Sequence, residues 1–167
     1  MLRSNYASRL KFLVDLNIEA TLSSESPQSS SLAGTKVFMA IGAILGKCHS
    51  FMHDLESFFW VLVWIWIHWN GPGKKARKSE FEEWNYLSTT RLARDKAGLV
   101  STERDFDSTI ERSFSDCCQI LTPYMRELRR AVFPSGSRWD REDRELSSRM
   151  RAVLEKARDD PKVLAII

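Results

Sequence analysis

Asp15 is a carboxylate placed where it could bind a metal ion. The short apolar run of residues 11–16 predicts a β-strand that ends at this aspartate, and the polar loop of residues 21–31 follows with seven serine or threonine hydroxyls. Mg²⁺ in proteins commonly binds one or two carboxylates together with water and substrate phosphates. An aspartate that only caps the turn after a strand is the simpler interpretation, and the local sequence leaves both open.

Asp54 stands at the start of the most apolar stretch of the chain, and Ser57 follows it by three residues. A carboxylate at the start of a helix can accept hydrogen bonds from backbone N–H groups and meets the positive end of the helix dipole. Such a cap needs no further function. A carboxylate in an otherwise apolar helix is nevertheless costly to bury without partners, so we expect specific donors around Asp54.

His49 and His53 lie four residues apart, which is the spacing of two zinc ligands on one face of a helix. No other pair of histidines or cysteines has ligand spacing, and a zinc site needs three or four protein ligands. The sequence therefore does not predict a metal site at these histidines. No hydrolase signature or glycine-rich phosphate loop occurs in the chain either.

The charged segments of the chain have simple interpretations. The run of residues 73–78, Gly-Lys-Lys-Ala-Arg-Lys, could bind phosphate or direct nuclear import, although a solvated loop between two helices explains it as well. The arginines of residues 126–151 alternate with acids, which is typical of an exposed, ion-paired helix surface. A net charge of +3, from 25 basic and 22 acidic residues, is too small to indicate nucleic-acid binding by itself.

Length and composition indicate one globular domain. The chain has 167 residues, of which 43% are hydrophobic, enough to build a core. Its three cysteines (Cys48, Cys117 and Cys118) contain no C-x-x-C pair and predict reduced thiols in an intracellular protein. No signal peptide is visible. The apolar run of residues 58–67 is well short of the roughly 18–20 residues that cross a bilayer, which favours a buried helix over a membrane span.

Periodicity and capping signals predict a mainly α protein with a short β element and a loop at the N-terminus. The expected helices span residues 54–69, 79–96, 102–132 and 140–158. The first is hydrophobic all round, which indicates a buried helix, and it stops at Asn-Gly-Pro-Gly in residues 70–73. Ser79 and Glu82 form a capping box for the second. Pro123 should divide the third and leave a separate short helix capped by Thr122.

Three pieces, in this order, resemble the C-terminal lobe of a eukaryotic-type protein kinase. They are the strand that ends at Asp15, the sequence GTKVFMAIGAILG in residues 34–46, and the sequence HSFMHDLESFFWVLVWIWIHWNGPGK in residues 49–74. Their sequences are similar to those of the fungal-type protein kinases, which are relatives of the casein-kinase group. The resemblance implies an activation segment at residues 15–46, a central buried helix at residues 54–69 and further lobe helices at residues 79–160.

The resemblance also implies roles for five residues. Asp15, in Asp-Leu-Asn rather than Asp-Phe-Gly, would bind the Mg²⁺ that holds the phosphates of ATP. Gly34 and Thr35 would face the protein substrate, and Asp54, with Ser57, would anchor the catalytic loop at the start of the central helix. The serine-rich loop would be the activation loop, whose hydroxyls are candidate phosphorylation sites.

Two departures from the family pattern affect this assignment. Gly42 stands where many kinases have the glutamate of Ala-Pro-Glu, so we expect Arg138 or a neighbour to lack that partner; the casein-kinase group also lacks this glutamate. The His-Arg-Asp catalytic loop should precede Asp15, but the fourteen residues before Asp15 contain neither histidine nor aspartate. The glycine-rich loop and ATP-contacting lysine of an N-lobe are not found either.

The sequence therefore predicts a protein-kinase-like domain from a family that transfers phosphoryl groups from ATP to protein serine or threonine. Without a catalytic loop and N-lobe we expect a truncated or degenerate copy that is inactive alone and binds ATP and Mg²⁺ poorly. The alternative is a non-enzymatic helical pseudokinase module that binds partners. We expect an intracellular protein, cytoplasmic or nuclear, with a protein partner or substrate, no nucleic-acid or membrane partner, and self-association through exposed apolar surface.

Overall fold

The computed structural model describes residues 36–165 of the chain. They belong to the second of two compact units, Ala33–Ile167, and the first unit spans Met1–Leu32. Several predicted features lie outside the described residues. They are the strand ending at Asp15, the Asp-Leu-Asn sequence, the serine-rich loop of residues 21–31, and the pair Gly34 and Thr35.

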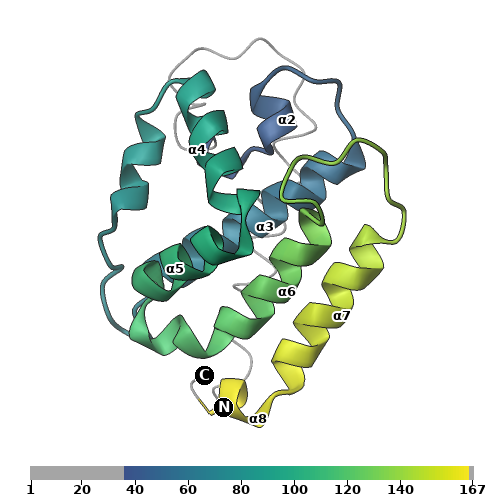
Figure 1. The fold of residues 1–167 in the computed structure, drawn as a ribbon. Helices are drawn as coiled ribbons and strands as arrows, with labels where there is room; N and C mark the ends of the chain where they lie inside the picture. Colours follow the sequence, from purple (N-terminus) through teal and green to yellow (C-terminus); the bar gives the residue numbers. More distant parts are fainter. Residues whose placement is uncertain (1–35, 166–167) are drawn as a thin grey trace. The chain divides into compact units, whose positions relative to one another are not determined.

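The described residues form helices and connecting loops, and no strand occurs between residues 36 and 165, so the predicted mainly α class is confirmed. The α-helices, labelled in Figure 1, and the short 3₁₀ helices follow one another in this order: η1 (Lys36–Phe38), α2 (Ile41–Ile44), α3 (Phe51–His68), η2 (Glu80–Asn85), α4 (Thr89–Ser101), α5 (Glu103–Ser113), η3 (Asp116–Leu121), α6 (Thr122–Val132), α7 (Leu146–Asp159) and α8 (Pro161–Leu164).

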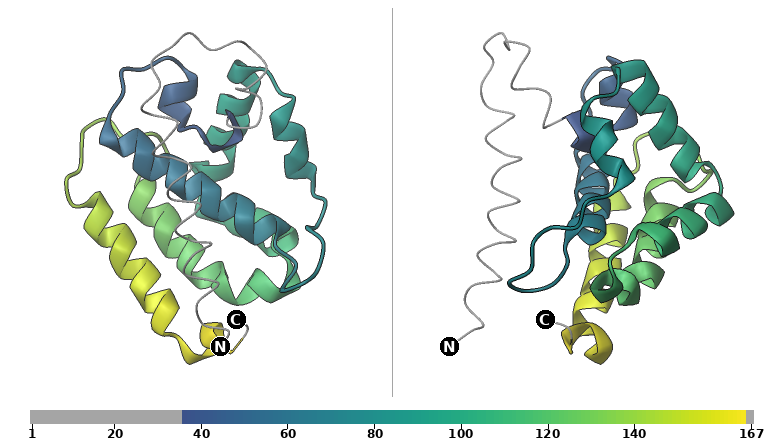
Figure 2. Two further views of the ribbon diagram at one scale, coloured as in Figure 1. Left: turned by 180° about the vertical axis from the view of Figure 1, so that it is seen from behind. Right: turned by 90° about the vertical axis from the view of Figure 1, so that its left-hand side faces the viewer.

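Helix α3 is the central element of this unit. No residue from Leu55 to Trp69 is exposed, and the rings of Phe59 and Trp60 are buried. Helix α3 packs against η1, α2, α6 and α7, so apolar side chains find partners on several of its sides. The views of Figures 1 and 2 agree that α6 and α7 lie side by side and that α2 lies beside α4.

Both ends of α3 are closed by side chains. At the start, Ser50 Oγ accepts a hydrogen bond from the Met52 N–H at 3.3 Å, and the Ser50 N–H donates to His53 Nδ1 at 3.3 Å. At the other end, the carbonyl of Trp69 accepts from Ser115 Oγ at 2.5 Å and from Cys117 Sγ at 3.3 Å. Polar backbone groups that a helix leaves unpaired at its ends are thus satisfied.

Two predicted helices are divided in the structure. Residues 79–96 form η2 and then α4, because Ser88 has an extended backbone and its hydroxyl accepts from the Arg91 N–H, which starts a new helix. Residues 102–132 form α5, η3 and α6. Thr122 was predicted to cap α6, but its hydroxyl is buried without a hydrogen-bond partner. Because Leu121 already has a helical backbone, η3 runs directly into α6 and no extended capping residue exists.

The last predicted helix begins later than residue 140. Asp143 Oδ1 accepts a hydrogen bond from the Glu145 N–H at 3.0 Å, which forms a local turn before α7.

The predicted turn at residues 134–137 is present. Gly136 has a φ of +69°, and a Cβ at this position would collide with the carbonyl of Ser101, so glycine is required.

Candidate functional site

The first half of α3 holds the backbone of the segment that follows Thr35 in the chain. Ser57 Oγ accepts a hydrogen bond from the Ala40 N–H at 3.1 Å, and Glu56 Oε1 accepts one from the Ile41 N–H at 2.7 Å. The two donors lie just before and at the first residue of α2. Neighbouring residues of α3 therefore fix the position at which η1 leads into α2.

Two lysines hold the same segment against α4 and the loop before it. Lys96 Nζ, from α4, donates to the Met39 carbonyl at 2.6 Å, and Lys36 Nζ donates to the Leu87 carbonyl at 2.5 Å. Lys96 is completely buried, and its ammonium group lies 4.6 Å from the centre of the Trp60 ring, within the range of a cation–π interaction. Residues 36–41 are thus attached to both α3 and α4.

Burial dominates the electrostatics of Glu56 and Lys96. It raises the pKa of Glu56, although the N–H groups of Ile41 and Trp60 and the charges of Lys96 and Arg138 oppose the shift. Burial lowers the pKa of Lys96 to about 7, and Glu56 opposes that shift. Both groups therefore have a reduced tendency to carry charge, as expected for ionisable side chains removed from water.

Asp54 was expected at the start of the central helix, but the helix starts before it. Helix α3 begins at Phe51, so Asp54 lies inside the first turn, and its side chain is 55% exposed. Its Oδ1 lies 3.2 Å from His49 Nε2, and it accepts no backbone N–H from the described residues. The expected backbone donors around Asp54 are therefore absent from residues 36–165. The role of Asp54 toward a catalytic loop stays a prediction.

Glu56 and Lys96 are the polar residues that the sequence reasoning missed. Glu56 is the only acid between Leu55 and Trp69, and Trp60 follows it by one helical turn. The structure uses this spacing, since the indole N–H of Trp60 donates to Glu56 Oε1 at 3.1 Å. Lys96 lies four residues from Leu92 and from Val100, at the spacing of a buried helix face. A single charged residue at a position where the helix periodicity expects an apolar one was the signal in the sequence that could have identified both residues as buried.

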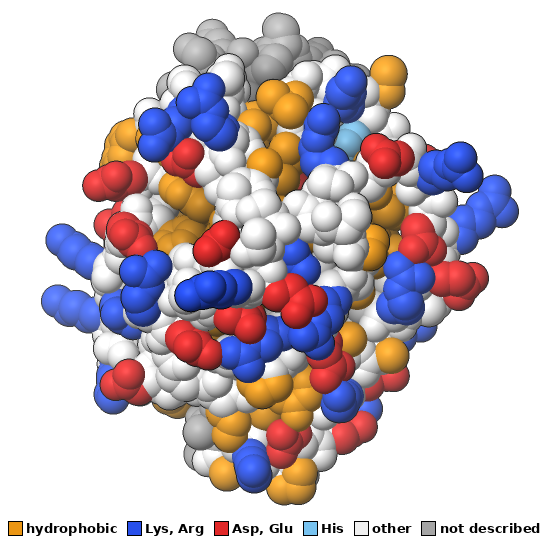
Figure 3. All heavy atoms as spheres, viewed as in Figure 1, with side chains coloured by type: hydrophobic (Ala, Val, Ile, Leu, Met, Phe, Trp, Pro, Cys, Tyr) orange, Lys and Arg blue, Asp and Glu red, His pale blue; other side chains and the backbone are white. Residues whose placement is uncertain are grey.

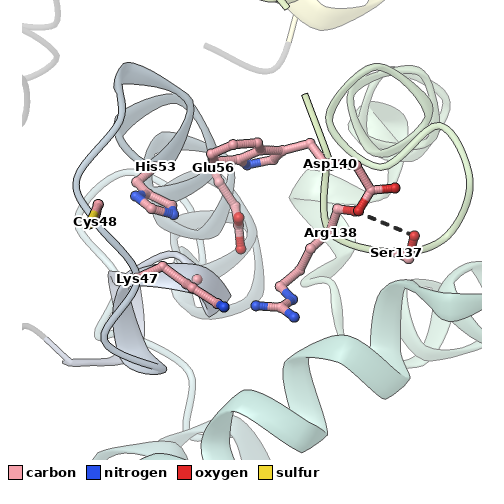
Figure 4. A pocket seen from close by; sticks show the side chains of 9 residues that line it. Lys47, Cys48, His53, Glu56, Ser137, Arg138 and Asp140 are labelled. Carbon is pink, nitrogen blue, oxygen red and sulfur yellow. Dashed lines mark hydrogen bonds between the residues drawn. The ribbon is translucent and has the colours of Figure 1, made fainter. Parts of the chain in front are cut away.

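A cavity of about 410 Å³ lies beside Glu56 and is lined by residues of α2, α3, the loop between these helices and the loop before α7. Figure 4 shows the side chains of Lys47 and Arg138 pointing toward each other beside the Glu56 carboxylate. Glu56 Oε2 is buried and has no hydrogen-bond partner among the described residues. The cavity thus combines two cations at its mouth with an unpaired carboxylate oxygen.

Gly42 lines the cavity without contributing a side chain, and the buried carboxylate that lines it belongs to Glu56 of α3. A Cβ at Gly42 would collide with the ring of His53, so this site has no room for a side chain. Arg138, which was expected to lack the partner that such a glutamate provides, shares the cavity with Glu56, and its charge lowers the pKa of that residue. No ion pair joins Glu56 and Arg138.

The two other classes of site considered from the sequence can be compared with the described residues. Between residues 36 and 165, no three His, Cys, Asp or Glu side chains are grouped so that they could hold a metal ion. His49 and His53 lie with their ring centres 6.3 Å apart, and Asp54 is the acid beside His49. In the same part of the chain, no helix has the length and apolar character needed to cross a membrane.

Comparison with known proteins identifies the N-terminal part of the chain. The family model described as fungal protein kinase matches residues 1–66. No curated protein and no solved structure matches the chain. The matched residues include Asp15, Gly34, Thr35, Asp54 and Ser57, and the match ends within α3. Residues 1–66, which contain most of the segment that carried the resemblance, are therefore similar to fungal protein kinases.

Proposed function

We propose that this chain is the helical C-terminal lobe of a fungal-type protein kinase, a domain for ATP-dependent phosphoryl transfer to protein serine or threonine. One observation carries the proposal: the family match continues into α3, whose first half holds the backbone at Ala40 and Ile41, five and six residues after Thr35. Phosphoryl transfer depends mainly on positioning and charge stabilisation, so a rigid support for a substrate-facing segment suits this chemistry.

Each residue has a role in this proposal. Asp15 would hold the Mg²⁺ that neutralises the phosphates of ATP, and Gly34 and Thr35 would face the substrate hydroxyl. Ser57 and Glu56 position the following backbone through Ala40 and Ile41. Asp54, which is exposed on the first turn of α3, would be available to a catalytic loop.

We further propose that the chain does not transfer phosphate by itself. The sequence His-Arg-Asp occurs nowhere in the 167 residues, and no glycine-rich phosphate loop occurs either. Phosphoryl transfer by kinases requires the catalytic aspartate and the phosphate-binding parts to act together. With these absent from the chain, Asp15 and Mg²⁺ would have neither a base nor a bound nucleotide to act with.

The experiment compares the chain alone with a chimera. In the chimera, the N-lobe and catalytic loop of an active fungal protein kinase precede residue 1, and transfer of labelled phosphate from ATP to a protein substrate is measured. We expect transfer from the chimera, loss of that transfer in its Asp15→Asn variant, and no transfer from the chain alone. Activity of the chain alone would disprove the claim of incompleteness. A folded but inactive chimera would favour the pseudokinase interaction module instead.

A further inference from the structure

The cations of the cavity beside Glu56 have no partner in the described residues. Neither Lys47 nor Arg138 forms an ion pair between residues 36 and 165. Asp140 also lines the cavity, but it does not pair with Arg138. Both cations point to the same space beside Glu56 (Figure 4), and two like charges that converge without an ion-pair partner attract an anion.

We propose that this cavity binds a tetrahedral oxyanion between Lys47 and Arg138, either free phosphate or the phosphoryl group of a phosphorylated side chain. A guanidinium group offers paired donors that match phosphate oxygens, and an ammonium group offers a point charge with three donors. The volume of about 410 Å³ accommodates the phosphoryl group together with water or with the side chain that carries it. This site is independent of the proposed phosphoryl transfer, because it uses neither Asp15 nor the pair Gly34 and Thr35.

Glu56 gives the site its polar floor. Its Oε2 is buried and unpaired, while Oε1 is fully used by the N–H groups of Ile41 and Trp60. An ionised Glu56 would repel the oxyanion and attract Arg138, whereas a protonated Glu56 could donate from Oε2 to a phosphate oxygen. Burial raises the pKa of Glu56, which reduces the cost of protonating it for the second arrangement but does not remove that cost. Removing the charge of Glu56 should therefore strengthen anion binding.

Apart from the acid Asp140, the remaining groups around the cavity do not repel an anion. His53 lies on the same side as Lys47, and its pKa is lowered by burial and by the neighbouring His49 and Arg138, which keeps the ring neutral. The ring centre of Trp139 lies 5.1 Å from that of His53, so the indole forms part of the wall. Trp139 is therefore a local reporter of whatever enters the cavity.

The basic loop of residues 73–78 provides the matched control. Lys75 is exposed, as Lys47 is, but it does not line the cavity beside Glu56. Non-specific attraction of anions to surface charge should respond equally to Lys47→Ala and Lys75→Ala. Binding in the cavity should respond only to the first.

The test uses the full chain and two probes, inorganic phosphate and capped O-phosphoserine, with the indole N–H signal of Trp139 followed by NMR and assigned with Trp139→Phe. We expect a saturable shift of this signal. Lys47→Ala and Arg138→Ala should each weaken binding about tenfold or more, as the loss of a charge-assisted hydrogen bond implies. Glu56→Gln, which keeps the acceptor Oε1, should strengthen binding, and Lys75→Ala should leave it unchanged.

The two probes distinguish the source of the oxyanion. Binding of phosphate alone indicates a free anion, and binding of phosphoserine indicates a phosphorylated side chain; either result supports the site if it depends on both cations. The proposal is overturned if neither probe shifts the Trp139 signal, or if Lys75→Ala weakens binding as much as Lys47→Ala. Since Lys47 and Arg138 are exposed, their variants should keep the thermal stability of the parent chain, which a melting curve verifies.

Discussion

The polar groups of α3 and those of α7 use charge in opposite ways. Glu56 in α3 is completely buried, and one of its oxygens binds two N–H groups from different parts of the fold. Lys156 in α7 forms an ion pair with Glu127 of α6 at 2.5 Å, but these side chains are 60% and 35% exposed. Figure 3 shows that charged side chains of both signs are interspersed over the face that it displays.

This difference indicates which charged groups contribute most to the stability of the fold. A buried carboxylate that loses its partners leaves them unsatisfied away from water, so its contacts are costly to break. An exposed ion pair exchanges readily with water and salt, so it contributes little to folding. The few buried polar groups around α2 and α3 should therefore matter more than the more numerous ion pairs on α6 and α7.

The strongest test of this contrast is the truncation of Glu56. Glu56→Ala should lower the free energy of unfolding by about 3 kcal/mol, because it leaves the N–H groups of Ile41 and Trp60 unpaired and enlarges the cavity. Urea unfolding measures this loss. Glu155→Ala, which removes an exposed acid of α7, is the matched control and should change stability by no more than about 0.5 kcal/mol. Equal effects of the two substitutions would remove the contrast.

The second test concerns Lys96 and pH. Its pKa is about 7 in the folded chain and 10.5 in a solvated lysine, so the unfolded state binds more protons between these values. The contribution of Lys96 to the free energy of unfolding should therefore rise with pH across this window. The difference in stability between the parent chain and Lys96→Met should change by about 2 kcal/mol from pH 7 to pH 9.

Measuring this difference at each pH cancels the contributions that other titrating groups make to the free energy of unfolding of both proteins. Lys75→Met is the control for an exposed lysine and should give a difference that does not vary with pH. A flat difference for Lys96→Met would mean that Lys96 ionises in the folded chain as it does in water.

The smallest effect is expected at the exposed pair of Lys156 and Glu127. Lys156→Ala should lower the free energy of unfolding by less than about 0.5 kcal/mol, since a solvent-exposed ion pair gains little beyond its interaction with water. Unfolding at low and at high salt provides the check, because screening should remove even this difference in 1 M NaCl. A loss comparable to that of Glu56→Ala would show that surface charge is as important as buried charge here.

Apolar patterning predicted most of the described fold. The buried character of α3, its stop before residues 70–73 and the turn at Gly136 followed from hydrophobicity and from the conformations available to glycine. The ion-paired surface of α6 and α7 followed from alternating charge. The break before α6 was predicted from Pro123, but η3 and the helical backbone of Leu121 that joins it to α6 were not. The break between η2 and α4 was not predicted either, because the capping strength of Ser88 depends on packing with distant residues.

The site was predictable only in part. The sequence of residues 12–74 resembles the fungal-type protein kinases, and the match of that family's model to residues 1–66 supports this resemblance. The burial of Glu56 was not predicted, because Asp54 and Glu56 both precede the same apolar run and the start of α3 at Phe51 decides which of them points inward. Lys96 and Glu56 are 40 residues apart, so their shared burial depends on tertiary packing that local patterns do not encode.

The closure of α3 at both ends has a consequence for cooperativity. Ser50 caps its start and Ser115 holds its last carbonyl, so α3 cannot fray without opening contacts to the loops that lead to η3 and α7. Because η1, α2, α6 and α7 all pack on this helix, its loss removes their shared partner at once. Hydrogen exchange of α3 amides should therefore require global unfolding, while α8, which packs on α7 and η3, can open locally.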